Sequence, residues 1–353
     1  MTSPTVSVVM AAYNGAALIE ETLASLSAQT MPDFEVIVVD DCSTDTTRDV
    51  VRAWPDPRVH LIEASENGGP VRARNRGFAE ARGRYIAGLD HDDICLPTRF
   101  ARQVAYLDAN PGTVLVAAAA TVFENGISRP SPLPPITSPK LIGWLLQIMN
   151  PLVWSTTMIR GEAARRLSPF TRPDRVYAED FDLYHRLAPM GEIARIDDVL
   201  LRYRDHPGSA SQRHRESMLA NTSGILAAAY APLLGDEADA ASRLVAEHVM
   251  AGIAVADRAT LRRLGAILTR LQSHYLQVAR PGRDDAALIR WETARLWWRI
   301  VRHAMRSGNI SLADAIAVRP EHLGLGHAGI DDLLLSGLIG SVRARRPVSP
   351  MLG

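Results

Sequence analysis

The sequence has little cysteine and no net charge. Its 353 residues include two cysteines, Cys42 and Cys95, which are too few for a disulfide framework, so we expect a reducing compartment. The 39 basic residues are balanced by 39 acidic ones. A general nucleic-acid-binding protein needs a net basic surface to neutralise phosphates, and the balance argues against that class.

Long apolar runs are also missing. The most apolar stretch, residues 141–159, contains Gln147, Asn150 and Pro151, so it is too polar and too interrupted for a membrane-spanning helix. We expect a short helix there, a turn at Asn150 and Pro151, and a buried strand over 152–159. The N-terminus shows no signal peptide pattern, and a cytoplasmic location is expected.

Neither common glycine-rich phosphate-binding loop is present. This absence argues against a dinucleotide-dependent oxidoreductase. A sugar-1-phosphate nucleotidyltransferase is also disfavoured, because residues 11–15 hold no glycine-rich basic loop after the first expected strand. If the protein binds phosphates, metal and arginine would have to hold them.

Short valine-rich runs alternate with helical patterns in the first half of the chain. The runs that we expect to be strands are residues 6–12, 34–39, 59–62 and 85–89. Helices are expected between them, at 72–81 for example, and after the last of them from Pro97 to about Leu107. Strands that are buried on both faces and separated by helices indicate a parallel sheet, so the predicted fold class is α/β.

A polar cluster follows each expected strand. The four clusters are Tyr13-Asn14, Asp40-Asp41, Asn67-Gly68-Gly69 and Asp90-His91-Asp92-Asp93. Ligands bind at the carboxyl ends of strands in open α/β sheets, so four clusters at one edge predict a binding site. Each cluster taken alone is more typical of a solvated turn, and only the four together favour a binding site.

The cluster at residues 90–93 is the richest in charge. Three carboxylates within four residues repel one another unless a cation lies among them, and hard oxygen ligands suit Mg²⁺ or Mn²⁺. We expect Asp90 and Asp92 to face the site and Asp93 to cap the helix that begins near Pro97.

Six segments together resemble glycosyltransferase family 2. They are SVVMAAYN at 7–14, VIVVDDCSTD at 36–45, NGGPVRARNRG at 67–77, GLDHDD at 88–93, AEDFDLYHRL at 178–187 and YRDHPGS at 203–209. The resemblance implies a GT-A (nucleotide-diphospho-sugar transferase) fold, a three-layer α/β/α sandwich. The expected domains are residues 1–217, with this fold, and a helical C-terminal appendage at 218–353.

The resemblance also implies roles for individual residues. A divalent metal, Mn²⁺ or Mg²⁺, would be held by Asp92, with His206 at the metal or the diphosphate, and Asp180 would be the catalytic base. The remaining implied contacts are with the nucleotide sugar: Ala12, Tyr13 and Asn14 at the base and ribose, Asp40 and Asp41 at the base edge, Arg74 at the base or diphosphate, Asp90 at the ribose, and Arg204 beside His206.

Two positions depart from the family pattern. Cys42 stands where the family commonly has glycine. His91 fills the variable place between two aspartates, where it is either a polar contact or solvent-exposed. Neither departure removes a charge that the chemistry needs.

The residues around Asp180 give an independent argument. Residues 178–187 predict a helix, and Leu183, Tyr184 and Leu187 share its face with Asp180. Burial would raise the pKa of Asp180 and the helix N-terminus would lower it. The alternative is an acid that only complements the helix dipole, and Glu179 fits that alternative better.

The last third of the sequence has helical spacing and no strand signal. Residues 287–305 mix three tryptophans with four arginines, which is typical either of a helix on an anionic membrane surface or of one that packs its tryptophans on the catalytic domain, with its arginines in water. We favour internal packing and keep peripheral contact with the inner membrane face as the alternative.

The expected function is therefore inverting, metal-dependent sugar transfer. The expected partners are a nucleotide-sugar donor, with UDP as the default, and a glycan or lipid-linked saccharide acceptor in cell-surface polysaccharide biosynthesis; no nucleic acid is expected. The alternative is a catalytically inactive nucleotide- or glycan-binding module of the same fold. That alternative predicts loss of the aspartates, yet Asp90, Asp92 and Asp180 are all present.

Overall fold

The computed structural model describes residues 3–124, 127–206, 213–323 and 329–344. The chain divides into two compact units. One holds residues 1–146 and 150–222, and the other holds residues 147–149 and 223–353. They are called the sheet unit and the helical unit below, and each is described by itself.

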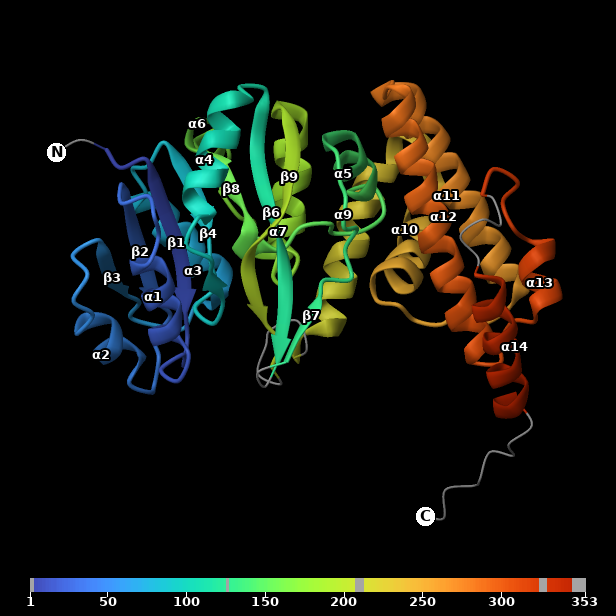
Figure 1. Ribbon diagram of the computed structural model, residues 1–353, viewed down its shortest axis with the longest axis horizontal. Coiled ribbons are helices and arrows are strands. Elements are labelled where there is room, and N and C mark those ends of the chain that lie inside the picture. The colour runs from blue at the N-terminus through green and yellow to red at the C-terminus, as the bar shows by residue number, and fades with distance from the viewer. Residues whose placement is uncertain (1–2, 125–126, 207–212, 324–328, 345–353) are drawn as a thin grey trace, which may run out of the picture. The chain divides into compact units, whose positions relative to one another are not determined.

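Within its described residues the sheet unit contains nine strands, β1 to β9. Figure 1 labels all of them except β5. Their bounds in chain order are β1 Val6–Ala12, β2 Phe34–Asp40, β3 Val59–Glu63, β4 Tyr85–Gly88, β5 Ile94–Cys95, β6 Thr113–Glu124, β7 Ile127–Pro130, β8 Met158–Arg160 and β9 Glu192–Arg204. Their spatial order is β3-β2-β1-β4-β8-β6-β9-β5, with β7 paired to β6. The first four strands match the predicted runs closely.

The sheet is parallel in one half and mixed in the other. Strands β3, β2, β1 and β4 are parallel neighbours, as the sequence predicts. Beyond them β8 runs antiparallel to both β4 and β6, whereas β6 and β9 are parallel. Strand β9, the last described strand in the chain, lies in this mixed half, beside β6.

Helices cover both faces of the sheet. The helices of this unit are α1 Ile19–Ser27, α2 Thr47–Arg52, α3 Gly69–Glu80, α4 Arg99–Ala109, α5 Pro139–Leu145, α6 Gly161–Arg165 and α7 Glu179–Leu187. Apolar residues of α1, α2 and α4 pack with Val8 of β1 and Val36 of β2 in the main core. Helix α3 lies on the other face, where Gly77 approaches Val9 and Val39 so closely that a Cβ would lie 3.0 and 3.2 Å from their methyl groups.

Two local predictions are wrong. Residues 152–159 do not form one strand, because the 3₁₀ turn η1 (Trp154–Thr156) precedes the three-residue strand β8. Its backbone turns because Thr156 and Thr157 donate their N–H groups to carbonyls three residues earlier. The proline-rich sequence of residues 123–140 predicts a loop, but strand β7 lies within this region.

The helical unit is built from helices alone within the described residues. Its elements are η4 Gly235–Glu237, α10 Ala238–Val245, η5 Ala246–Met250, α11 Arg258–Ala279, α12 Arg283–Arg306, α13 Leu312–Ala317 and α14 Ile330–Ala344, together with the second half of α9 (Arg215–Leu234). Residues 147–149 belong to this unit, and the Tyr230 hydroxyl donates to the Gln147 carbonyl at 2.6 Å.

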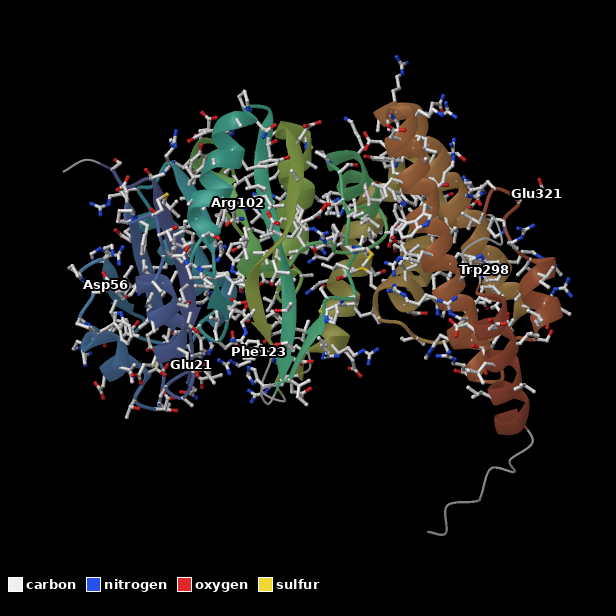
Figure 2. All side chains as sticks on the ribbon, in the orientation of Figure 1. Glu21, Asp56, Arg102, Phe123, Trp298 and Glu321 are labelled. Atoms are coloured by element: carbon white, nitrogen blue, oxygen red, sulfur yellow. The ribbon has the colours of Figure 1, made fainter. Side chains whose placement is uncertain are left out.

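Two of the three tryptophans of α12 are buried. Trp297 and Trp298 are fully buried, and Figure 2 shows Trp298 among the helices, whereas Trp291 is 38% exposed. The packing of these tryptophans on the catalytic domain stays a prediction. In the described part of the chain, residues 215–250 are long and apolar enough, by length and composition only, to count as a candidate membrane span. One such segment is weak evidence for a membrane-spanning helix, because buried core helices pass the same test.

Gly88, the last residue of β4, provides a test of the packing beside the site. A Cβ there would lie 2.6 Å from Cε2 of the Trp154 ring and 2.8 Å from the Trp154 carbonyl oxygen, neither of which can move freely. We predict that Gly88→Ala lowers the free energy of unfolding by about 1–3 kcal/mol, measured by urea denaturation. Gly112→Ala is the control, because nothing lies within 4 Å of its Cβ position. Equal effects of the two substitutions would contradict the prediction.

Candidate functional site

The polar clusters meet at one edge of the sheet. Strands β3, β2, β1 and β4 are parallel neighbours, so their carboxyl ends lie together. Asn67 Nδ2 donates to the Asp41 carbonyl at 3.1 Å, and His91 Nδ1 lies 3.3 Å from the Ala11 carbonyl oxygen. His91 is partly buried and packs so closely on Gly15 that a Cβ there would lie 2.3 Å from its ring. The prediction of a shared edge is confirmed.

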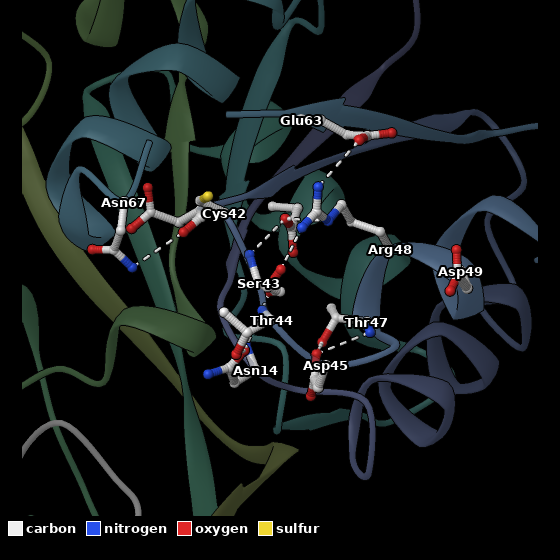
Figure 3. A network of polar contacts seen from close by, with 12 residues as sticks. Asn14, Cys42, Ser43, Thr44, Asp45, Thr47, Arg48, Asp49, Glu63 and Asn67 are labelled. Atoms are coloured by element: carbon white, nitrogen blue, oxygen red, sulfur yellow. Dashed lines mark hydrogen bonds and ion pairs between the residues drawn. The ribbon is translucent and has the colours of Figure 1, made fainter. Parts of the chain in front are cut away.

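The loops after β1 and β2 are joined by hydrogen bonds (Figure 3). The Thr44 N–H donates to Asn14 Oδ1 at 2.8 Å, and the Asn14 N–H donates to Ser43 Oγ at 3.0 Å. The Gly15 N–H donates to Thr47 Oγ1 at 2.8 Å. The two loops therefore form one rigid surface. On it Ala12 is buried and the Tyr13 ring is 45% exposed.

Asp40 and Asp41 are buried and bonded to backbone. Asp40 Oδ1 accepts from the Ser43 N–H at 3.0 Å. The two carboxylate oxygens of Asp41 accept from the N–H groups of Gly68 and Gly69 at 2.8 and 2.7 Å. Both side chains thus hold the loop and the start of α3 in place. Their contact with a nucleotide base stays a prediction.

The end of β9 lies against the acidic turn after β4. His206 Nε2 lies 2.9 Å from Asp92 Oδ2. Arg204 donates from Nε to the Asp92 carbonyl and from its backbone N–H to Asp93 Oδ1, both at 2.8 Å. The fold therefore brings together two residues that the sequence separates by more than a hundred positions, Asp92 and His206.

The Arg204 guanidinium has further partners within the protein. It pairs with Glu21 of α1, and it lies over the ring of Phe123 at 4.5 Å from the centroid. Figure 2 labels both Glu21 and Phe123. These contacts fix the direction of the Arg204 side chain at the edge of the site.

The predicted helix cap by Asp93 is wrong. Strand β5 lies between Asp93 and helix α4, whose N-cap residue is Thr98. The Asp93 carboxyl instead accepts the backbone N–H of Arg204 in β9. Asp93 is fully buried. Burial, reinforced by the charges of Asp92 and Asp90, raises the pKa of Asp93 well above its usual range.

No group of three or more His, Cys, Asp or Glu side chains with the geometry of a metal site occurs within the described residues. Asp92 and His206 do lie together, and their oxygen and nitrogen atoms suit a divalent cation. Residues 207–209, the last part of the YRDHPGS segment, lie outside the described residues.

Arg74 lies between two carboxylates. Its Nη2 contacts Asp90 Oδ1 at 2.8 Å, and its Nη1 forms a hydrogen-bonded ion pair with Glu179. The guanidinium lies 4.9 Å from the centroid of the Trp154 ring, and the residue is 8% exposed. Burial alone would lower the pKa of Arg74, but the charges of Asp90 and Glu179 outweigh it and raise the pKa. Arg74 therefore connects α3, the turn after β4 and the start of α7.

Asp180 lies in the first turn of α7, as predicted. Its Oδ1 accepts from the Phe181 N–H at 2.7 Å and its Oδ2 accepts from Asn150 Nδ2 at 2.9 Å. Desolvation by the surrounding protein and the charge of Glu179 raise the pKa of Asp180 to about 6, against the opposing effect of Arg74. The carboxyl therefore changes protonation near neutral pH, as a general base should.

The sequence analysis assigns no role in the site to three residues that lie beside it. Asn150 was assigned only to a turn. Ser155 accepts the Asp90 N–H at 3.0 Å. Tyr184 is fully buried, and its hydroxyl has no hydrogen-bond partner among the described residues. The one available signal was the helical spacing of Tyr184 from Asp180, which places both on one face.

Comparisons with known proteins agree with this geometry. A family model of glycosyl transferase family 2 matches residues 7–167. The amylovoran biosynthesis glycosyltransferase AmsE of Erwinia amylovora is 30% identical over 191 residues, which cover 53% of this chain and 70% of that protein. The chain belongs to glycosyltransferase family 2.

Other relatives of the family extend the comparison. The succinoglycan biosynthesis protein ExoO of Rhizobium meliloti is 46% identical over 125 residues, and these cover 35% of this chain and 36% of that protein. The chain thus spans little more than a third of the length of ExoO. The crystal structure of S. aureus TarS 1–349 in complex with UDP-GlcNAc superposes with a TM-score of 0.56 at 19% identity, covering 98% of this chain and 93% of that one. The predicted GT-A fold is confirmed.

Cys42 offers a test of the loop after β2. Its φ of +63° is a left-handed conformation that glycine adopts readily and that disfavours a side chain. We predict that Cys42→Gly raises the free energy of unfolding by about 1 kcal/mol in urea denaturation. Cys42→Ala keeps the strain and is the matched control. A less stable glycine variant would contradict the prediction.

Proposed function

We propose that the protein transfers a sugar from a nucleotide diphosphate sugar to a glycan or lipid-linked saccharide acceptor, with inversion at the anomeric carbon. The observation that carries this proposal is that Arg74 joins Asp90, at the carboxyl edge of the sheet, to Glu179, the residue before Asp180, whose pKa is raised to about 6. Membership of glycosyltransferase family 2 supports it. The names of AmsE and ExoO favour a role in cell-surface polysaccharide biosynthesis.

The donor would lie over the loops after β1 and β2. The exposed ring of Tyr13 offers a surface on which a nucleotide base can stack, and Ala12 and Asn14 flank it. UDP is the favoured nucleotide, and the complex of TarS with UDP-GlcNAc supports this choice. Asp90 would meet the ribose.

A divalent cation, Mn²⁺ or Mg²⁺, fits the pair formed by Asp92 and His206. A carboxylate oxygen and an imidazole nitrogen 2.9 Å apart are two converging ligands, and diphosphate oxygens and water would complete the shell. When bound, the cation would supply charge stabilisation for the leaving diphosphate. Arg204 holds the turn on which Asp92 lies.

Asp180 would act as the general base. Its carboxylate accepts the proton of the acceptor hydroxyl while that oxygen attacks the anomeric carbon, and the nucleoside diphosphate leaves from the opposite face of the sugar. Asn150 and the Phe181 N–H hold both carboxylate oxygens in place. A single displacement of this kind requires no covalent intermediate.

Donor binding can be tested by thermal shift with UDP, GDP, dTDP and CMP, each with Mn²⁺, Mg²⁺ or EDTA. We expect UDP with metal to raise the melting temperature, because a ligand that binds only the folded state stabilises it by mass action. Asp92→Ala should remove the metal dependence. Asp198→Ala, at a half-exposed position paired with Arg102, should not. No shift with any nucleotide would argue against the proposal.

The role of Asp180 can be tested with Asp180→Asn, which keeps the shape and removes the base. We expect transfer to fall about 10²–10⁴-fold while UDP binding is retained. In the unaltered protein kcat/KM should fall with decreasing pH below about 6, because protonation of Asp180, whose pKa is raised to about 6, removes the base. Transfer at the original rate in Asp180→Asn would refute this role.

A further inference from the structure

Asn150 lies in the connection between α5 and η1, and both ends of its amide are bonded. Its Oδ1 accepts from the Leu152 N–H at 3.2 Å, and its Nδ2 donates to Asp180 Oδ2 at 2.9 Å. A backbone N–H can only donate, so the amide oxygen must face Leu152 and the NH₂ group must face the carboxylate. The chain therefore fixes the orientation of this amide.

The second oxygen of Asp180 is also held. Oδ1 accepts from the Phe181 N–H at 2.7 Å, so each carboxylate oxygen has one donor within the protein. An ionised carboxylate has about four lone-pair sites, so sites remain for an incoming hydroxyl. The two donors come from different segments and thereby set the plane of the carboxylate.

Charged and titratable groups from two helices surround Asp180. Arg74 of α3 lowers the pKa of Asp180, and Glu179 of α7 raises it. Burial and the charge of Asp180 in turn raise the pKa of the Tyr184 hydroxyl. Arg74 is already paired with Glu179 and with Asp90. Asn150, which is uncharged, adds a donor to the carboxylate without adding a further charge.

We propose that Asn150 is a positioning residue for the reaction, and that its amide orients the Asp180 carboxylate toward the acceptor hydroxyl. The proposal rests on the proposed role of Asp180 as base. A neutral amide suits this task because it cannot take the proton from the base, whereas a lysine or arginine would hold the carboxylate too strongly in its charged form. Asn150 would contact Asp180 and not the donor.

The test compares Asn150→Ala and Asn150→Asp with the unaltered protein over pH 5–9. The NH₂ donor favours the ionised carboxylate, so its loss raises the pKa of Asp180. We expect the acid limb of kcat/KM to move up by about one pH unit in Asn150→Ala, and by more in the nearly isosteric Asn150→Asp. In Asn150→Ala the pKa change alone should lower kcat/KM near pH 6 about fivefold, and a further loss should persist at pH 9 because the carboxylate is no longer oriented, with UDP affinity unchanged.

Asn110→Ala is the matched control. The Asn110 amide donates to the Tyr106 carbonyl at the end of α4, so its loss should lower stability without moving the pH profile. Asn150→Asp keeps the acceptor for the Leu152 N–H and therefore provides a folded variant if Asn150→Ala does not fold. Unchanged pH profiles in the Asn150 variants that fold would overturn the proposal.

A second measurement separates this proposal from the proposed function. The ¹³Cγ signal of Asp180, assigned with Asp180→Asn, reports its titration without any turnover. A higher pKa of Asp180 in Asn150→Ala supports the contact, and an unchanged pKa overturns it. Full activity in Asp180→Asn would instead refute the base while leaving this titration result intact.

Discussion

The candidate site depends on one buried, positively charged side chain, that of Arg74. Arg74 pairs with Asp90 and with Glu179, and its guanidinium lies against Trp154. Removal of one partner from a buried ion pair leaves an uncompensated charge, which is far more costly than loss of a surface pair. Helix α3, the turn after β4 and the start of α7 are therefore constrained by a single side chain, and Asp180 takes its place from that constraint.

Much of the remaining geometry follows from paired loops. Asp41 binds the start of α3, and Asn14 binds the loop after β2. These contacts use carboxylate and amide groups that a solvated turn would leave to water. Asp and Asn side chains hold the loops at this edge in place, and the same residue types commonly bind nucleotides. The composition of such a loop therefore cannot show whether it is a structural turn or part of a binding site.

The first half of the fold could be predicted because its strands are valine-rich and short. Strand β6 could not, because residues 117–120 are four consecutive alanines, which favour a helix, and only pairing with β9 makes them extended. The motifs located Asp90, Asp92 and Asp180. Arg74 and Glu179 form an ion pair although they lie 105 residues apart in the sequence, and no local pattern predicts such a pair.

The three residues 147–149 carry a consequence for how this protein can be divided. They lie in sequence inside the sheet unit but belong to the helical unit, where Ile148 is 1% exposed and Tyr230 binds Gln147. A fragment cut after residue 222 would leave the Gln147 carbonyl without its donor Tyr230, three residues before Asn150. The helical unit therefore cannot be removed or exchanged by cutting the chain at one position, because two separate segments of the chain belong to it.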